Sequence, residues 1–375
     1  MKKVIIVGGG FAGRAVLSII YGYRKKLDLE ITLVNDKNES SFLPLLPDCL
    51  GRGVRTENLI CDLTRLNIKG NFDFVRDKVV AIDLDKKVVA TSALSLNYDF
   101  LIIASGSETN FYGREEIRRN VFKLDDANDA IAIRRALVKE NYDFYLIAGG
   151  GYTGIEVATN LRLYLDKKGL KQRVIVVERA SSILGPLPQW MKDYVISNLN
   201  KCNIEVLNNI VIDKTEESFV QLSDGSIFKN ALLVWAAGVK TASFIENLRV
   251  EKNAQGRIKV DDYLRLDDSC FVVGDAALFA QNNNFLRMAV QFAIMQGDCV
   301  AKNIVRIIKG KPLTRYKPID FGYIIPMANN KACGTILGMN IKGFFPIILH
   351  YFMCIFRSNG LKNKLGIIKD LLKGG

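Results

Sequence analysis

Two glycine-rich segments with the same spacing constrain the fold of this chain more than any other feature. Both VIIVGGGFAG and LIAGGGYTGIE run from apolar residues into the pattern G-x-G-x-x-G, and a helix-like segment follows each. The glycines of the two patterns are Gly8, Gly10, Gly13, Gly149, Gly151 and Gly154. The first glycine of such a turn permits a sharp bend, the second lets the backbone approach a pyrophosphate, and the third lets the helix pack on the strand. The helix N-terminus then favours the charge of the diphosphate. Two copies predict two dinucleotide sites.

The chain repeats one scheme around these turns: a strand, a helix, a second apolar strand, and a strand that ends in small residues. The predicted segments are 3–7, Ala15–Tyr23, Ile31–Val34 and Phe100–Gly106 in the first copy, then Leu146–Ala148, Ile155 to about Leu165, Val174–Glu178 and Leu232–Gly238 in the second. Apolar strands alternating with helices favour parallel sheets, and the alternating residues 72–90 predict a small antiparallel insert. We therefore predict a doubly wound α/β fold with two Rossmann-like dinucleotide-binding domains.

The residue at the end of the second strand indicates which nucleotide fits each copy. Glu178 holds this position in the second copy, where a carboxylate bonds ribose hydroxyls and repels a 2′-phosphate, so NADH is favoured over NADPH. The neighbouring Arg179 tempers this preference. In the first copy the position is Asn35, followed by Asp36, and an amide still bonds a ribose hydroxyl.

Two bound dinucleotides suggest a relay in which NADH gives a hydride to FAD, with the protein orienting the cofactors and excluding water. The segment FVVGDAA supports a flavin in the first copy. Asp275 is expected to end a strand and begin a helix, where its carboxylate bonds ribityl hydroxyls. The alternative for Asp275 is an ordinary helix N-cap.

Composition limits the location and partners of the protein. The net charge of +13 is compatible with nucleic acid, anionic lipid or simple solubility, and no nucleic-acid-binding motif accompanies it. Seven scattered cysteines without C-x-x-C indicate reduced thiols and no zinc or other metal site. The apolar run at the start is too short for a secretory signal, and no apolar stretch reaches the ~20 residues that span a bilayer.

The assembled motifs resemble the FAD-dependent pyridine nucleotide oxidoreductases, and among them the type II NADH dehydrogenases. The resemblance runs from Lys2 to about Lys309 and rests on GGGFAG, FLPLLPD, YDFLIIASGSETNFYG, AGGGYTGIEVA, VWAAGVK and FVVGDAA. It implies that Gly106 lies near the flavin, that Glu156 lies near the nicotinamide, and that Gly274 and Asp275 contact FAD.

The resemblance also implies domain bounds and a set of site residues. The expected FAD-binding domain comprises 1–112 and 240–315, the NADH-binding domain 113–239, and a C-terminal region 316–375. The predicted cofactor-binding residues are Gly8, Gly10, Phe11, Ala12, Gly13, Asn35, Asp36, Gly106, Gly149, Gly151, Tyr152, Thr153, Gly154, Glu178, Gly238, Gly274 and Asp275. The predicted catalytic residues are Glu156 and Gln291.

The expected electron acceptor is a quinone, and this expectation rests on the sequence of one predicted helix. The family pattern A-Q-x-A-x-Q lines the quinone site, and here it reads VQFAIMQG. Gln291 and Ala293 match the pattern, whereas Val290 and Met295 depart from it and Gln296 follows. This departure leaves open the identity of the acceptor and, for Met295, a purely structural role in the core.

The C-terminal residues predict a peripheral attachment to the cytoplasmic face of the cell membrane. GFFPIILHYFMCIF is very apolar, and the following segment 359–373 places Leu361, Leu365, Ile368 and Leu372 on one helical face with lysines elsewhere. A basic amphipathic helix beside an apolar segment is typical of binding in the plane of an anionic membrane. The alternative is a surface helix that packs on the body of the protein or on the second subunit of a homodimer.

Related flavoproteins provide the competing functions. A sulfide:quinone oxidoreductase or a thiol/disulfide-reducing flavoprotein requires thiols at the flavin, for which Cys49 and Cys333 are the candidates. The lone His350 is expected to be interfacial or structural. A third alternative is a non-catalytic flavoprotein that senses redox state. We favour a membrane-associated NADH:quinone oxidoreductase that does not pump protons.

Overall fold

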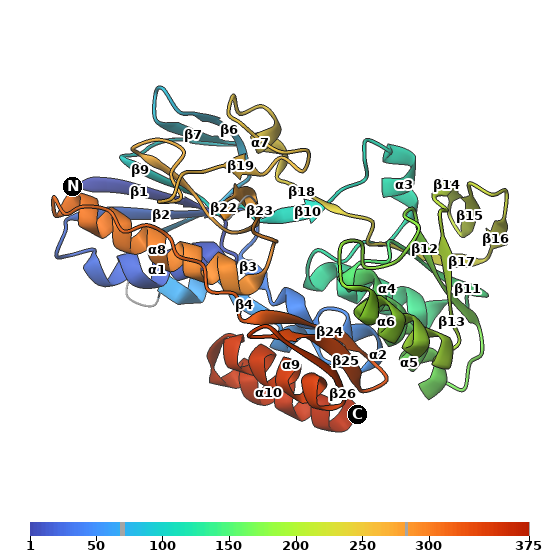
Figure 1. Cartoon of the computed structure of the whole chain (residues 1–375). Coiled ribbons are helices and arrows are strands. Elements are labelled where there is room, and N and C mark those ends of the chain that lie inside the picture. The colour runs from blue at the N-terminus through green and yellow to red at the C-terminus, as the bar shows by residue number, and fades with distance from the viewer. Residues whose placement is uncertain (68–71, 282–283, 375) are drawn as a thin grey trace. The chain divides into compact units, whose positions relative to one another are not determined.

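In a computed structural model of the protein, which describes residues 1–67, 72–281 and 284–374, the chain divides into two compact units (Figure 1). The first unit comprises residues 1–40, 62–108 and 239–320, and the second comprises 41–61, 109–238 and 321–375. The second unit thus contains two segments outside the expected NADH-binding domain, residues 41–61 and the C-terminal region.

The first unit is built on a five-stranded parallel sheet with the order β20-β9-β1-β2-β5. Its strands are β1 (Lys2–Val7), β2 (Leu29–Asn35), β5 (Asp73–Arg76), β9 (Phe100–Ile103) and β20 (Cys270–Val272). One face packs on α1 (Phe11–Ile20) and α8 (Val290–Ile308), where Ile6, Val16 and Ile304 are fully buried. Burying a side chain of this kind stabilises the fold by about 1.5–3 kcal/mol.

The other face of this sheet is covered by strands and a short helix. The three-stranded antiparallel sheet of β6 (Val79–Asp83), β7 (Val88–Thr91) and β8 (Ser95–Asn97) packs there with α7 (Ser243–Glu246). The expected antiparallel insert at 72–90 is therefore confirmed over β6 and β7, whereas 73–76 forms β5 of the parallel sheet.

The smaller elements are η1 (Tyr21–Tyr23), β3 (Glu39–Ser41), η4 (Thr64–Asn67), β10 (Ser107–Thr109), β18 (Val239–Thr241), β19 (Ile258–Lys259), η5 (Gly274–Ala276), β21 (Ala277–Leu278), β22 (Ala280–Gln281) and β23 (Asn284–Phe285).

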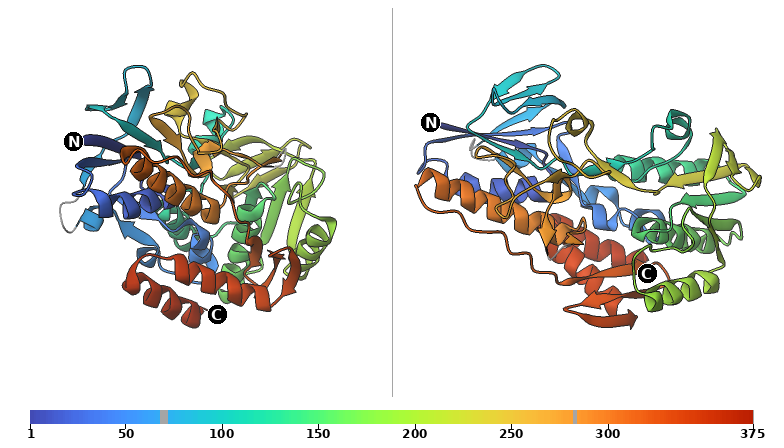
Figure 2. Two further views of the ribbon diagram at one scale, coloured as in Figure 1. Left: turned by 60° about the vertical axis from the view of Figure 1, so that its left-hand side comes forward. Right: turned by 45° about the horizontal axis from the view of Figure 1, so that its top comes forward.

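The second unit repeats this plan with a four-stranded parallel sheet of order β13-β12-β11-β17. Its strands are β11 (Phe144–Ala148), β12 (Arg173–Glu178), β13 (Ile204–Asn208) and β17 (Ala231–Trp235). One face packs on α4 (Ala127–Lys139), α5 (Tyr152–Lys167) and α6 (Gln189–Lys201). The other packs on α3 (Glu115–Asn120) and the antiparallel sheet of β14 (Ile212–Glu216), β15 (Phe219–Leu222) and β16 (Ile227–Lys229). The two views of Figure 2 show both faces covered in each unit, and the predicted fold class is confirmed.

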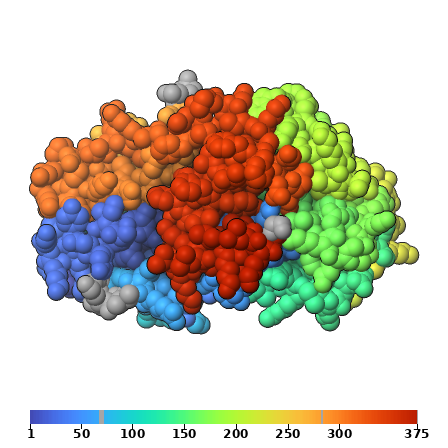
Figure 3. Space-filling view, turned by 90° about the horizontal axis from the view of Figure 1, so that it is seen from below, coloured from blue at the N-terminus to red at the C-terminus, as the bar shows by residue number. Residues whose placement is uncertain are grey.

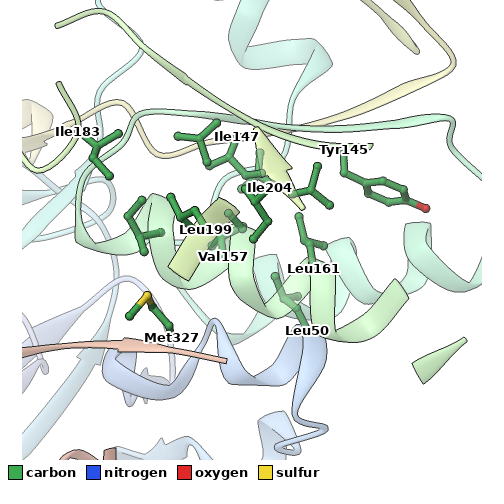
Figure 4. Packing of buried hydrophobic residues seen from close by; sticks show 14 of the residues in the cluster. Leu50, Tyr145, Ile147, Val157, Leu161, Ile183, Leu199, Ile204 and Met327 are labelled. Carbon is green, nitrogen blue, oxygen red and sulfur yellow. The ribbon is translucent and has the colours of Figure 1, made fainter. Parts of the chain in front are cut away.

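Residues 41–61 and 321–374 complete the second unit. Leu50 and Met327 belong to the buried cluster around α5 (Figure 4). The first segment carries η2 (Leu43–Leu45), α2 (Asp48–Gly51), η3 (Thr56–Asn58) and β4 (Ile60–Asp62), and the second carries β24 (Gly322–Met327), β25 (Lys331–Ile336), β26 (Met339–Gly343), α9 (Phe345–Arg357) and α10 (Gly360–Gly374). Gly51 lies so close to α5 that a Cβ there would collide with the carbonyl oxygen of Asn160. No helix in the described parts of the chain is long and apolar enough to span a membrane.

Candidate functional site

The first glycine turn has the geometry that a pyrophosphate requires. Gly8 has φ +103°, and a Cβ there would collide with the Ala104 carbonyl oxygen. A Cβ at Gly13 would collide with the Gly8 carbonyl oxygen, so this glycine allows α1 to approach β1 closely. At Gly10, by contrast, a Cβ would meet nothing within 4 Å. The chain thus leaves open space over the N-terminus of α1, where the second glycine of the pattern admits phosphate.

The second turn reproduces this geometry almost atom for atom. Gly149 has φ +105° and lies against the Ala236 carbonyl, Gly154 lies against the Gly149 carbonyl, and the space at Gly151 is open. A cavity of about 460 Å³ lies over this turn, and its lining includes Gly151, Glu178 and Arg179. Its size lies in the ~300–1,000 Å³ range of small-molecule sites.

Asn35 and Glu178 play the same structural part in the two units. The Gly9 N–H donates to Asn35 Oδ1 at 2.8 Å, and the Gly150 N–H donates to Glu178 Oε2 at 2.7 Å. Glu178 Oε1 also accepts from the Ala180 N–H at 2.8 Å. Each side chain therefore holds its glycine turn in place, a role that the sequence did not reveal. Both remain candidates to bond a ribose through their further lone pairs, and Asp36 is exposed beside Asn35.

Asp275 lies in the single 3₁₀ turn η5, not in the first turn of a long helix. The expectation that Asp275 begins the helix was wrong, because α8 starts only at Val290. The carboxylate accepts from Ser107 Oγ at 2.9 Å. Burial raises the pKa of Asp275 against the opposing effects of the Ser107 hydrogen bond and of Arg257. Asp275, which is half-buried, and Gly106 (φ +67°) belong to the same unit as the first turn.

The α8 helix presents Gln296, rather than Met295, to the Gly274 loop. The Gly274 N–H donates to Gln296 Oε1 at 2.7 Å, and the Gln296 side chain is 2 % exposed. Met295 is half-buried and lines a different cavity. Gln291 is buried, and its Nε2 donates to Asp320 Oδ1 at 3.1 Å. The contact with the Gly274 loop is thus made by Gln296, the residue after Met295, while Gln291 bonds to Asp320.

The other predicted cofactor residues line the two turns or neighbour them. Phe11 and Ala12 begin α1, and Arg14 lies over the Phe11 ring with 5.5 Å to its centroid. Tyr152 packs edge-on against Tyr323, and Thr153 beside it is exposed. Gly238 has φ +138° and lies against the Tyr112 hydroxyl.

Glu156 adjoins a polar cluster that the sequence gave no reason to expect. Burial, and then the carboxylate of Asp48, raise the pKa of Glu156 well above its ordinary value. Asp48 itself accepts from the Tyr351 hydroxyl at 2.9 Å and pairs with Arg52 at 3.2 Å. Burial raises the pKa of Asp48 to about 6 although Arg52 opposes it, and burial lowers the pKa of His350 to about 4. The cluster joins three distant parts of the chain, at residues 48–52, 156 and 350–351, so the sequence spacing between these parts carries no signal.

The two candidate redox thiols lie in buried surroundings that disfavour the thiolate form. Cys49 and Cys333 are both fully buried. Burial, and then the Asp48 carboxylate, raise the pKa of Cys49 far above its ordinary range, and burial alone raises that of Cys333 to about 12. Because thiolates are the reactive form, neither cysteine has the environment of a redox centre.

Comparisons with known proteins agree with this geometry. Residues 2–297 match the family described as pyridine nucleotide-disulphide oxidoreductase. The chain is similar to proteins named type II NADH:quinone oxidoreductase from Haemophilus influenzae, with 27 % identity over 90 % of this chain and 87 % of the relative, and from Staphylococcus aureus, with 27 % identity over 91 % of each.

Solved structures share the fold at lower identity. The structure of NDH2 from Plasmodium falciparum in complex with NADH superposes with a TM-score of 0.86 at 17 % identity, covering 99 % of this chain and 98 % of that one. The sulfide:quinone oxidoreductase from Aquifex aeolicus gives 0.79 at 20 % identity, covering 100 % and 92 %. The two glycine turns, the two sheets and the family match over 2–297 lead to one conclusion. The chain belongs to the pyridine nucleotide-disulphide oxidoreductase family.

Proposed function

We propose that this protein is an NADH:quinone oxidoreductase that transfers two electrons from NADH to a quinone without pumping protons. The observation that carries the proposal is the cavity over the second glycine turn, because its lining includes Glu178, a carboxylate of the kind that bonds ribose hydroxyls in dinucleotide-binding folds. The names of the similar proteins from Haemophilus influenzae and Staphylococcus aureus describe the same activity for those relatives.

FAD fits the first unit. The open space at Gly10 admits its pyrophosphate, and the N-terminus of α1 favours the negative charge. Asn35 holds the turn, and we propose that the half-buried carboxyl of Asp275 bonds sugar hydroxyls of the cofactor. The chemistry that bound FAD supplies is acceptance of a hydride from a nicotinamide and return of two electrons to an acceptor.

We assign roles to the two proposed catalytic residues from their surroundings. Burial, and then the Asp48 carboxylate, raise the pKa of Glu156 and so favour its protonated form, and we assign it the role of a hydrogen-bonding group beside the nicotinamide. Gln291 projects from the first turn of α8, oriented by Asp320, and contacts the quinone. Both assignments rest on the proposed function.

We further propose that the protein attaches to the cytoplasmic face of the membrane through α9 and α10. Figure 3 shows the C-terminal residues forming a continuous exposed surface, in red. Large apolar side chains on this surface are exposed by between 37 and 82 %: Phe344, Phe345, Ile348, Phe352, Phe356, Leu361, Leu365, Ile368 and Leu372. Lys362, Lys369 and Lys373 are exposed on α10. Apolar anchors combined with cations favour an anionic lipid surface over a homodimer contact.

The test is anaerobic reduction of the purified yellow protein with NADH, NADPH or sulfide in separate cuvettes, followed by addition of a water-soluble quinone. We expect NADH to bleach the flavin absorbance fastest and the quinone to restore it. The double substitution Cys49→Ala with Cys333→Ala should leave NADH:quinone turnover unchanged. Bleaching by sulfide in the absence of bleaching by NADH would overturn the proposal in favour of a sulfide oxidoreductase.

A further inference from the structure

A cavity in the first unit is separate from the one over the second glycine turn, and it lies outside both glycine turns and the Gly274 loop. It has a volume of about 490 Å³ and lies between α8 and the extended segment 312–317, with Tyr23 of η1 at one side. The α8 residues that line it are three, four or seven positions apart, so they share one helical face. Asp298, Lys302 and Arg306 are among them. Thr314 to Lys317 form the opposite wall.

The wall opposite α8 is fixed by hydrogen bonds rather than by a regular element. Asn303, which is fully buried, donates from Nδ2 to the Thr314 carbonyl and accepts the Thr314 N–H at Oδ1, both at 2.9 Å. Arg306 Nε donates to the Pro312 carbonyl oxygen at 2.5 Å. These bonds hold the extended segment beside the helix, so the cavity is a built feature of the unit.

Positive charge dominates this cavity. Lys302, Arg306, Arg315 and Lys317 line it, against the single carboxylate of Asp298. Burial raises the pKa of Asp298, and the positive charge of Lys302 opposes this shift. Arg315 pairs at 3.4 Å with Asp262, and no carboxylate among the residues the structure describes forms an ion pair with Lys302 or Lys317. The four cations outnumber the carboxylates beside them, and such an excess of positive charge attracts anions.

The uncharged residues that line the cavity indicate which kind of anion fits it. Met295, Val305 and the rings of Tyr23 and Tyr316 provide apolar surface beside the cations. Lysine ammonium groups and arginine guanidinium groups are the side chains that bind phosphate oxygens best. We propose that this cavity binds a phosphate group that carries a small organic part. A soluble organic phosphate and the headgroup of an anionic phospholipid both have this chemistry.

The proposal does not depend on the redox function, because no cavity-lining residue belongs to the glycine turns and the four cations that line the cavity all lie outside the segment Gln291–Gln296. It is tested on the FAD-loaded protein with saturating NAD⁺ present, so that phosphate probes cannot bind over the second glycine turn. The probes are inorganic pyrophosphate, measured by titration calorimetry, and phosphatidylcholine vesicles with or without phosphatidylglycerol, measured by co-flotation.

The informative variant is Lys302→Ala with Lys317→Ala, and the matched control is Lys78→Ala with Lys86→Ala, which removes two exposed lysines elsewhere on the same unit. We expect K302A/K317A to lose about tenfold or more in affinity, since each charge-assisted hydrogen bond contributes about 1.5–3 kcal/mol, with the control and the NADH-to-dye activity unchanged. A loss for pyrophosphate indicates a soluble ligand, and a loss confined to phosphatidylglycerol vesicles indicates a lipid headgroup. Equal binding by wild type and K302A/K317A, an equal loss in the control, or no binding of either probe to wild type would overturn the proposal.

Discussion

We expect Glu178 to have two roles at the end of β12, and one substitution separates them. Its Oε2 accepts a hydrogen bond from the Gly150 N–H, and we expect its charge to repel the 2′-phosphate of NADPH. Glu178→Gln keeps an oxygen acceptor for the turn and removes the charge. We expect the ratio of kcat/KM for NADPH to that for NADH to rise about tenfold or more, since charged hydrogen bonds differ from neutral ones by about 1 kcal/mol or more, and Arg179 in the same cavity then faces no carboxylate.

The control for this variant is Glu205→Gln on the neighbouring strand β13, where the carboxylate pairs with Arg173 away from the cavity. Steady-state kinetics with both nucleotides check the prediction. An unchanged ratio in E178Q would mean that the carboxylate serves only to hold the glycine turn.

Glu156 gives a second prediction at the level of one residue, and the sign follows from proton linkage. Its pKa is raised in the folded chain, so the folded state binds more protons than the unfolded state, and the free energy of unfolding falls as pH rises above the unfolded pKa. Glu156→Gln removes this dependence. We expect the Tm of E156Q to exceed that of wild type at pH 8 and the excess to shrink towards pH 5.

Thermal unfolding followed across this pH range provides the measurement, with Glu217→Gln at an exposed position as the control. A Tm difference that stays constant from pH 5 to pH 8 would show that Glu156 is ionised throughout, and the proposed neutral role beside the nicotinamide would then fail.

Among the elements, α10 is held to its unit by a buried acid. Asp370 accepts from the Arg55 N–H at 2.9 Å, from Arg55 Nε at 3.0 Å and from Asn58 Nδ2 at 2.6 Å. Asp370→Ala leaves these donors without that acceptor, which costs roughly 2 kcal/mol. We expect α10 to detach transiently and to be cut faster in limited proteolysis, with Asp85→Ala on the exposed β6–β7 turn cleaved as slowly as wild type. Equal cleavage rates would show that apolar packing alone retains the helix.

The same elements show what a sequence of this kind predicts well. The strands and helices around the glycine turns were predicted because local patterns determine them: four or five apolar residues, a turn that needs positive φ, and an amphipathic helix. The packing of residues 41–61 with 321–374 was not predicted, since contacts such as Asp48 with Tyr351 join distant parts of the chain. Gln296 likewise became distinguishable from Met295 only when its bond to Gly274 was seen.

At the scale of the whole molecule, the two units share one architectural plan, and the second unit carries an addition to it. Each unit places a glycine turn at the carboxyl edge of a parallel sheet, with helices on one face and an antiparallel sheet on the other. The second unit adds a C-terminal region whose outer face is apolar and whose inner face is tied down by Ile367 and Asp370. The proposed membrane contact therefore has to be tested on the outer face alone, because removing the whole tail from Gly343 would also strip cover from the core.

Leu361→Gln, Leu365→Gln and Leu372→Gln together change only exposed positions of α10. Each leucine that enters the bilayer interface contributes up to about 2 kcal/mol, so the triple variant should lose most of its vesicle binding. We expect the triple variant to remain in the supernatant after sedimentation with anionic vesicles while keeping full NADH-to-dye activity. Its quinone turnover should fall only for quinones dissolved in the lipid.

The control Leu337→Gln with Met339→Gln removes exposed apolar residues at the β25–β26 turn. If the triple variant sediments with lipid as completely as wild type, these three leucines of α10 do not contribute to membrane binding.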